Sequence, residues 1–136
     1  MTPARMSEAE YRALAELRYQ MRRVVRVAEA AARDVGLTPA QHQLLLVVRG
    51  WPDPSGPTLT EVAERLQQQL HSVSGLADRA EVAGLVRRRA DPHDGRRHHL
   101  VLTRRGRAQL DALYRTHRDE LGRARRDLLR ALTAAT

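Results

Sequence analysis

Residues 87–103 read RRRADPHDGRRHHLVLT, and this stretch decides the fold. Short runs of strand-forming residues flank a centre that contains proline and the pair Asp94-Gly95, and an Asp-Gly pair is typical of a turn between two strands. The stretch therefore predicts a β-hairpin with strands over 85–90 and 97–103. Five arginines lie on the two sides of the turn. Because like charges repel one another, such a cluster indicates an anionic partner.

Three helical patterns precede the hairpin. Residues 38–50 begin with a Thr38 cap and with Pro39, and their body is almost wholly apolar, which predicts a buried helix. Residues 58–66 form a short amphipathic pattern, and after the glutamines at 67–69 a further helix is predicted over 70–83. Two short helices joined by a tight turn are typical of a helix-turn-helix, and a hairpin directly after them makes it a winged one.

Long amphipathic helices are predicted at both ends of the chain. Ser7 and Glu10 form a capping box, and the apolar stripe that follows runs to Asp34. Such a helix is about 42 Å long, so part of its stripe needs a partner outside the subunit. Thr103 can cap a second long stretch, in which we expect a break near Gly122. A two-fold dimer would place two recognition helices ~34 Å apart, over a pseudo-palindromic DNA site.

The predicted fold class is therefore mainly α with a small β-hairpin, a winged helix-turn-helix with long N- and C-terminal dimerisation helices. The expected domains are an N-terminal dimerisation helix over 1–36, a DNA-binding lobe over 37–106 with its wing at 85–103, and C-terminal dimerisation helices over 107–136.

The composition favours a polyanionic partner and excludes several other classes. The net charge is +8, and eight arginines against two aspartates place +6 of it within 85–107. A small basic protein is drawn to nucleic acid or to anionic membranes. All 24 basic residues are arginine, a bias that genomic base composition also produces. Cysteine is absent, which excludes disulfides and thiolate metal sites. Without a signal peptide or an apolar run of about 18 residues, we expect a cytoplasmic protein and no membrane partner.

Four motifs occur in the order and at the distances of a known family. LTPAQHQLLLVVRG (37–50), PTLTEVAERLQ (57–67), HSVSGLADRAEVAGLVRR (71–88) and DPHDGRRHHLVLTRRG (91–106) together resemble the multiple-antibiotic-resistance regulator (MarR) family of winged helix-turn-helix regulators. The last motif resembles the family's wing, Asp-Pro-any-Asp-Arg-Arg and a strand that ends in Leu-Thr, two residues and Gly. Gly95 stands where the family often has Arg, which leaves Arg96 and Arg97 as the wing arginines. The resemblance implies a homodimeric repressor that binds double-stranded DNA and responds to a ligand.

Candidate DNA-binding residues lie in the recognition helix, which is the second helix of the helix-turn-helix and is predicted over 70–83, and in the wing. Polar side chains near a helix N-terminus bind phosphates or base edges, and arginines bind the narrow minor groove. The set is Gln69, His71, Ser72, Ser74, Gly75, Arg79, Arg88, Asp94, Arg96 and Arg97. For Arg96 and Arg97 the other interpretation is pairing with Asp91 or Asp94, which can coexist with DNA contact. Arg79 is equally suited to pairing with an acid. Gly75 inside a helix costs about 1 kcal/mol relative to alanine, which close approach to DNA and tolerated drift explain equally well.

Other kinds of site have weaker signals. The resemblance implies a pocket for a small aromatic or phenolic effector, with candidates Tyr11, Tyr19, His42 and Trp51. His93, His98 and His99 raise the question of a metal, but adjacent strand residues point to opposite faces and no cysteine or glutamate joins them, so we expect none. No phosphate loop, catalytic triad or carboxylate pair is recognisable, so neither an enzyme nor a cofactor is expected.

Three alternatives stay open at this point. A constitutive DNA-binding regulator without a ligand differs from the sensing version only in a ligand titration. A winged helix that docks on an acidic protein would show no competition by duplex DNA. A basic membrane module would carry bulky Trp or Phe on its long helices, which contain neither.

Overall fold

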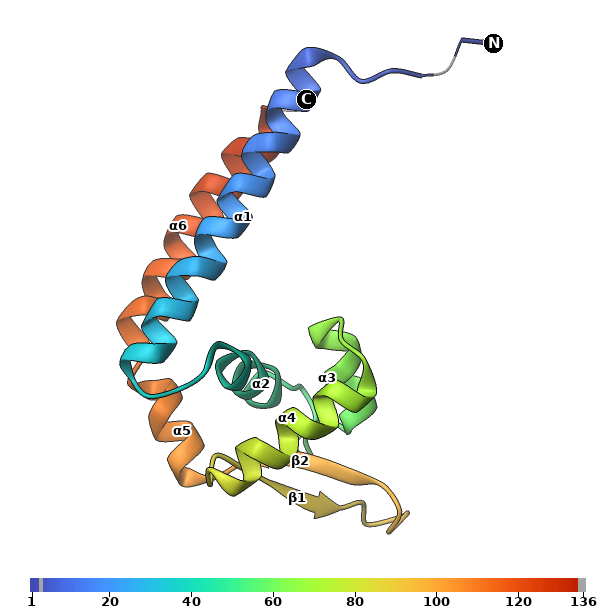
Figure 1. Ribbon diagram of the computed structural model, residues 1–136, viewed down its shortest axis with the longest axis vertical. Helices are drawn as coiled ribbons and strands as arrows, with labels where there is room; N and C mark the ends of the chain where they lie inside the picture. Colours follow the sequence, from blue (N-terminus) through green and yellow to red (C-terminus); the bar gives the residue numbers. More distant parts are fainter. Residues whose placement is uncertain (3, 135–136) are drawn as a thin grey trace. The chain divides into compact units, whose positions relative to one another are not determined.

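The structure is a computed structural model that describes residues 1–2 and 4–134. It is mainly α-helical with one two-stranded hairpin, as the sequence predicts. In chain order the elements are α1 (Glu8–Asp34), α2 (Pro39–Arg49), α3 (Leu59–Leu66), α4 (Leu70–Val82), β1 (Val86–Ala90), β2 (His98–Leu102), α5 (Arg104–Asp111) and α6 (Tyr114–Thr133), shown in Figure 1. The chain divides into two compact units, Met1–Ala31 with Tyr114–Thr136 (unit 1) and Ala32–Leu113 (unit 2).

Two helices of unit 2, α2 and α3, begin at side-chain caps. Thr38 and Gln41 form a complete capping box at α2, and Thr58 and Glu61 form another at α3. The turn between α3 and α4 passes through Gln67, whose φ of 52° is left-handed and ends α3. These local signals fix where α2 and α3 begin and where α3 ends. They therefore define the first helix and the turn of the helix-turn-helix.

The hairpin follows α4 and is anchored to the rest of unit 2. β1 and β2 pair antiparallel, with Val86 opposite Leu102 and Ala90 opposite His98. The segment before α3 pairs with β2, because the Leu100 amide donates to the Pro57 carbonyl at 2.8 Å. The base of the hairpin is thus held by the pairing of its two strands and by the segment before α3. The tip at 91–97 extends beyond this segment.

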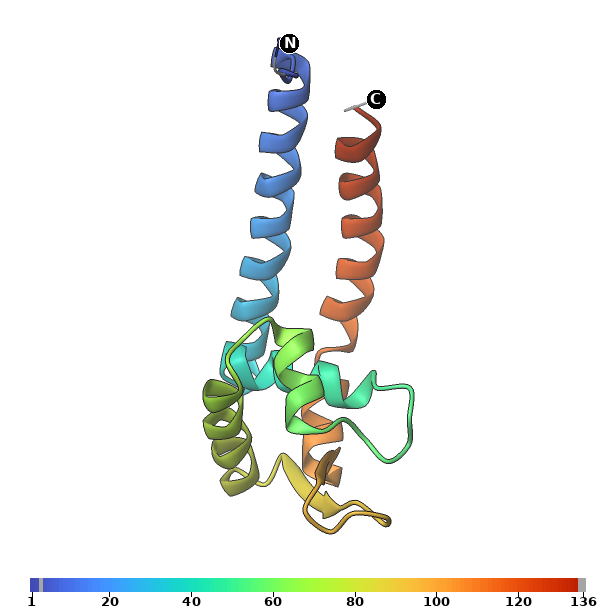
Figure 2. The ribbon, with the colours of Figure 1, turned by 90° about the vertical axis from the view of Figure 1, so that its right-hand side faces the viewer.

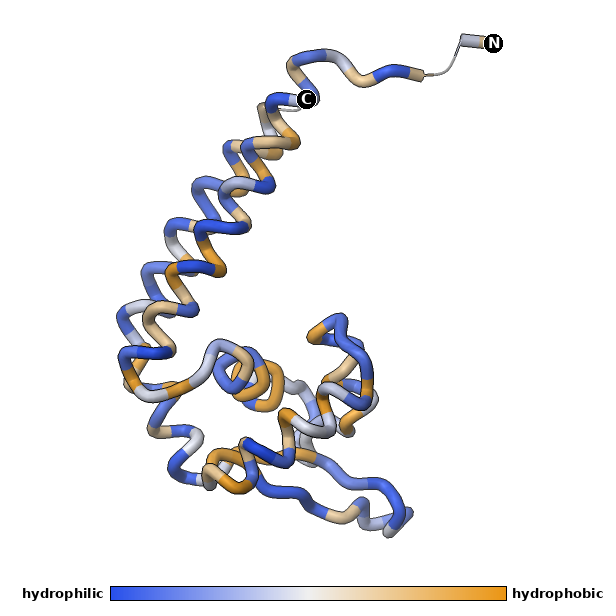
Figure 3. The backbone as a smooth tube through the Cα atoms, in the orientation of Figure 1, coloured by the Kyte–Doolittle hydropathy of each residue, from blue (hydrophilic) through white to orange (hydrophobic). Residues whose placement is uncertain are grey.

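The core of unit 2 is made of aliphatic side chains from every helix of the lobe and from the base of the hairpin. Its most buried members include Leu44, Leu45, Val62, Val73, Leu76, Leu85, Val86 and Leu100. Figure 3 shows this pattern, with hydrophobic residues along α2 and hydrophilic ones along most of the hairpin. Burial of such side chains stabilises a fold by about 1.5–3 kcal/mol each, which fixes α4 and the hairpin on one scaffold.

Unit 1 consists of two long helices, α1 and α6, which run antiparallel alongside each other (Figure 2). Within its described part, the buried residues are all alanines, Ala13, Ala28 and Ala131. Large apolar side chains of both helices are exposed instead: Tyr11, Leu14, Tyr19, Met21, Val25, Val27, Tyr114, Leu121, Leu129 and Leu132. Unit 1 therefore buries little apolar surface by itself.

The expected break near Gly122 is wrong. α6 is continuous from Tyr114 to Thr133, and the helical course is interrupted earlier, at residues 112–113. A single glycine costs a helix only about 1 kcal/mol relative to alanine, which a long helix tolerates. Leu113 is buried, so the break lies where the chain leaves the core of unit 2.

Among residues 1–2 and 4–134, no helix combines the length and the apolar character that crossing a membrane requires.

Candidate nucleic-acid interface

The recognition helix α4 is amphipathic, and its polar face is largely exposed. Val73, Leu76, Ala77 and Ala80 are buried, which turns the opposite face outward. The exposed residues of that face include His71, Ser72 and Arg79, while Ser74 and Gly75 are half-buried. Gln69 precedes the helix as its N-cap but makes no side-chain capping bond, so its amide leaves the first N–H groups of α4 uncapped. The predicted residues of the recognition helix thus lie together.

Arg88 joins the wing to the recognition helix. Its Nη2 lies 2.5 Å from Asp78 Oδ1 on α4, and its backbone N–H donates to Glu81 Oε2 at 3.2 Å. Its Nε is buried and has no hydrogen-bond partner among the residues that the structure describes. The sequence offers Arg88 as a DNA contact, whereas this guanidinium is already ion-paired and fixes β1 against α4. DNA contact by Arg88 stays a prediction.

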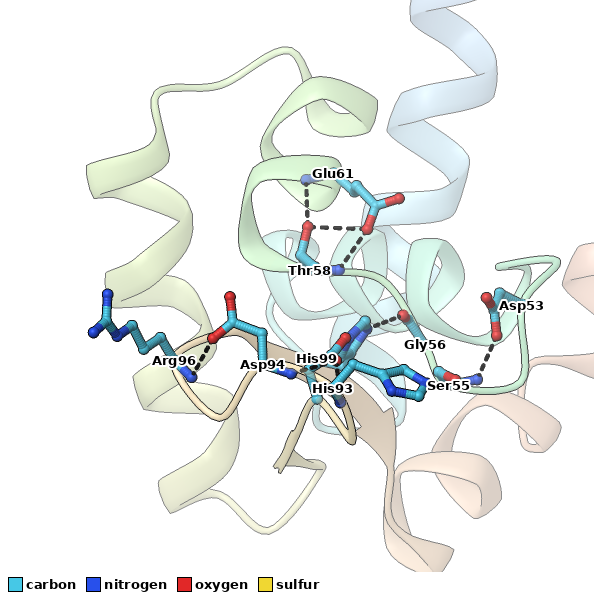
Figure 4. A network of polar contacts seen from close by, with 10 residues as sticks. Asp53, Ser55, Gly56, Thr58, Glu61, His93, Asp94, Arg96 and His99 are labelled. Carbon is cyan, nitrogen blue, oxygen red and sulfur yellow. Dashed lines mark hydrogen bonds and ion pairs between the residues drawn. The ribbon is translucent and has the colours of Figure 1, made fainter.

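The two aspartates of the wing bind backbone N–H groups. Asp91 Oδ1 accepts from the amides of His93 at 2.8 Å and Asp94 at 3.0 Å, and Asp94 Oδ1 accepts from the amide of Arg96 at 3.0 Å (Figure 4). The Asp91 amide donates to the Arg97 carbonyl at 2.9 Å and closes the loop. The acids therefore organise the turn through its main chain.

The guanidinium groups at the wing tip are left unpaired by this arrangement. Arg96 and Arg97 are exposed, and within the described part of the chain neither side chain forms an ion pair. Figure 4 shows the Arg96 side chain pointing away from the Asp94 carboxylate. The alternative in which Asp91 or Asp94 neutralises these arginines is thus not what the structure shows. An exposed, unpaired arginine retains its full attraction for phosphate.

His99 locks the wing to the loop before α3. Its Nδ1 lies 2.7 Å from the Gly56 carbonyl oxygen and its Nε2 lies 2.7 Å from Asp91 Oδ2. Both partners are acceptors, so the ring satisfies both only when both nitrogens carry protons. The hydrogen bond to Asp91 raises the pKa of His99 above its ordinary value of 6.5, with the Gly56 carbonyl as the second cause. The same bond is the main reason why the pKa of Asp91 falls to about 2.

Sequence reasoning missed this role of His99. The spacing of the three wing histidines points only to the question of a metal, but both nitrogens of His99 are occupied, while His93 and His98 are exposed. No group of three metal-ligating side chains occurs among the described residues. No local signal reveals the lock, because its partners lie 8 and 43 residues away along the chain.

The four effector candidates have different surroundings. Tyr11 and Tyr19 are exposed on α1 in unit 1. His42 is buried in α2, and Trp51 stacks under the Arg65 guanidinium, 5.6 Å from the ring centre, beside a shallow cleft of about 300 Å³. A pocket built from these residues stays a prediction.

Comparisons with known proteins agree with this geometry. A model of the MarR family matches residues 35–97, from the start of unit 2 to the wing tip. A MarR-family transcription regulator of known structure is 27% identical, covers 82% of this chain and 72% of its own, and superposes with a TM-score of 0.71. No curated protein sequence matches.

Two further solved structures share the fold. The DNA complex of MepR from S. aureus is 22% identical, covers 79% of this chain and 77% of its own, and has a TM-score of 0.64. Bordetella bronchiseptica BpsR, whose DNA binding is regulated by 6-hydroxynicotinic acid, is 24% identical, covers 89% and 82%, and has a TM-score of 0.63.

The exposed polar helix, the basic hairpin after it and the buried scaffold beneath them define a winged helix-turn-helix. In sequence over residues 35–97 and in fold, the chain is similar to transcription regulators of the MarR family, as its sequence motifs predict. This similarity supports a role in DNA-binding regulation of transcription.

Proposed function

We propose that this protein is a homodimeric repressor that binds a pseudo-palindromic duplex operator, with α4 in the major groove and the wing along the minor groove or backbone. The observation that carries the proposal is the state of the wing. Its carboxylates bind main-chain amides and His99, while Arg96 and Arg97 stay exposed and unpaired. A narrow minor groove concentrates negative potential and binds such arginines.

The test is fluorescence anisotropy of a labelled duplex at several salt concentrations. Affinity should fall steeply with salt, because each phosphate contact releases bound counterions. Replacing Arg96 and Arg97 by alanine should lower affinity and reduce the slope of log affinity against log salt by about 1 per lost contact. The matched control replaces Arg5 and Arg26, which carry the same charges outside the lobe. An equal loss of duplex affinity in both double variants would mean that the wing arginines contribute only net charge, and it would overturn the proposal.

The surface of unit 1 supports the dimer. Within its described part, unit 1 buries only alanines, and its two helices expose leucine, tyrosine and valine over most of their length. A patch of this kind on a folded protein marks an interaction site. The two helices also leave a cleft of about 150 Å³, lined by Gln20, Val24, Val27 and Thr116 among others, which apolar side chains of a second copy can fill.

Sedimentation equilibrium tests this part of the proposal. The protein should be a dimer at the concentrations at which it binds the duplex, and Leu121→Glu should shift it toward monomer and weaken binding together. A wild-type monomer that binds DNA with full affinity would contradict the dimer.

The proposed effector is a small aromatic or phenolic anion. The regulation of BpsR by 6-hydroxynicotinic acid supports this class. Salicylate titrated against the protein–duplex complex should lower its affinity, because a ligand that changes the spacing of two recognition helices breaks their register with successive grooves. No change with salicylate or 6-hydroxynicotinate would favour the constitutive alternative. The protein would act where its DNA lies, in the cytoplasm.

A further inference from the structure

The middle of the recognition helix contains an unusual pairing of a glycine and an arginine. Gly75 lies one helical turn before Arg79, and both belong to the outward face of α4. Side chains of a helix lean toward its N-terminus, so the Arg79 side chain covers the surface at position 75. A Cβ atom added to Gly75 would lie 3.2 Å from Arg79 Nη1. The bare backbone at Gly75 is therefore the surface on which the guanidinium rests.

The Arg79 guanidinium is also free of any acid. Asp78, its neighbour, is held by Arg88 on β1 through Oδ1. Within the described residues, Arg79 itself forms no ion pair. An exposed arginine on the outward face of a helix, with no competing carboxylate, presents its five donors to a ligand.

From these two observations we infer that Gly75 and Arg79 act together as a specificity determinant, in which Arg79 reads a guanine and Gly75 positions it. This inference rests on the proposed function. Guanine presents O6 and N7 in the major groove, and arginine binds both with two parallel hydrogen bonds. Such a bidentate contact depends on the position and the orientation of the guanidinium plane. A methyl group at position 75 would displace the guanidinium, because its Cβ would lie 3.2 Å from Arg79 Nη1, and would take away the surface on which it rests.

Gly75 is a positioning residue in this arrangement, and its effect passes through Arg79. The two explanations that the sequence leaves open, close approach of DNA to the backbone and drift, make different predictions. If DNA approached the backbone closely, a methyl group would weaken all duplex binding, with or without Arg79. If the glycine were drift, Gly75→Ala would change nothing except helix stability.

The experiment is a double-mutant cycle with four proteins: wild type, Gly75→Ala, Arg79→Ala and the double variant. Selection from random duplexes first defines the preferred half-site of the wild type. Anisotropy at one fixed salt concentration then gives the ratio of affinities for the selected duplex and for the same duplex with its guanine positions substituted. Gly122→Ala is the matched control, since it makes the same change in α6, where a Cβ has open space.

We expect Arg79→Ala to lower the preference for guanine at one position of each half-site about tenfold or more. Gly75→Ala should lower the same preference and unfold at the same or a higher denaturant concentration. In the Arg79→Ala background it should have no further effect on the preference.

Three results would overturn the inference. One is a Gly75→Ala variant with wild-type preference, and another is a Gly75→Ala variant whose loss persists without Arg79. The third is a wild type whose selected half-site lacks any preference that Arg79→Ala removes. If the wild type binds no duplex at all, the proposed function fails first, so the two failures are distinguishable. Denaturant unfolding of Gly75→Ala separates a loss of preference from a loss of folding, because the alanine by itself favours the helix.

Discussion

The close approach of α5 to the end of the recognition helix makes Gly106 a sharp test of the packing. A Cβ atom added to Gly106 would lie 2.1 Å from the carbonyl oxygen and 3.1 Å from the carbonyl carbon of Leu85. Thr103 fixes the same junction, since its Oγ1 donates to the Gly84 carbonyl at 2.6 Å and accepts from the Gly106 amide at 3.0 Å. Backbone therefore meets backbone, and no side chain can rotate away.

We expect Gly106→Ala to destabilise the protein by about 2 kcal/mol. Relieving the overlap requires α5 to move away from Leu85 by about 1 Å, and overpacking of a well-packed site costs about 1–3 kcal/mol, with the upper end applying to rigid backbone. The gain in helix propensity offsets about 1 kcal/mol of this cost. Leu85 connects α4 to β1, so the same displacement should weaken duplex binding.

The assay is urea unfolding followed by circular dichroism, at one protein concentration because a dimer's stability depends on it. Gly122→Ala is the control for propensity, since nothing lies within 4 Å of its added Cβ, and it should gain up to about 1 kcal/mol. A Gly106→Ala protein as stable as the wild type would refute the close approach of α5 to Leu85.

Three further predictions concern the wing and its supports. Because the pKa of His99 is raised above 6.5, its contribution to stability is complete below pH 6.5 and is lost as pH rises through the raised value; thermal unfolding of His99→Gln should lack this loss. Because the pKa of Asp91 is lowered from 3.8 to about 2, its contribution is present above pH 3.8 and is lost as pH falls toward 2, a decline that Asp91→Asn should remove from an acid titration followed by circular dichroism. Asp78→Ala should cost at most about 1 kcal/mol in urea unfolding, since its ion pair with Arg88 is partly exposed, yet it should lower duplex affinity in anisotropy by releasing β1 from α4.

Features set by neighbouring residues could be predicted from the sequence. Thr38 caps α2 and Thr103 caps α5 as expected, because a capping side chain bonds an amide only three residues on. The hairpin can also be predicted from the sequence, since its strand pattern and its turn residues are contiguous. The winged helix-turn-helix followed from the order of these elements.

Features set by distant partners could not be predicted. The sequence gives Arg88 the character of a DNA contact, but its ion pair depends on where α4 packs relative to β1. The lock at His99 needs Gly56, which lies 43 residues earlier. The prediction of a helix break at Gly122 is wrong for a different reason. A single glycine does not end α6, and the interruption lies instead at residues 112–113, where Leu113 is buried.

Charge counting alone would misjudge the wing. Two aspartates beside Arg96 and Arg97 lower the net charge of the tip, which should weaken its attraction for phosphate. In the structure, however, Asp91 and Asp94 accept hydrogen bonds from three main-chain amides, and Asp91 also binds His99. The acids therefore lower the positive charge of the wing tip, but they also fix the loop. The fixed loop holds the guanidinium groups outward and unpaired. Asp78 acts in the same way on α4, because it binds Arg88 and leaves Arg79 free. The interface depends on which arginine each acid binds more than on the sum of their charges.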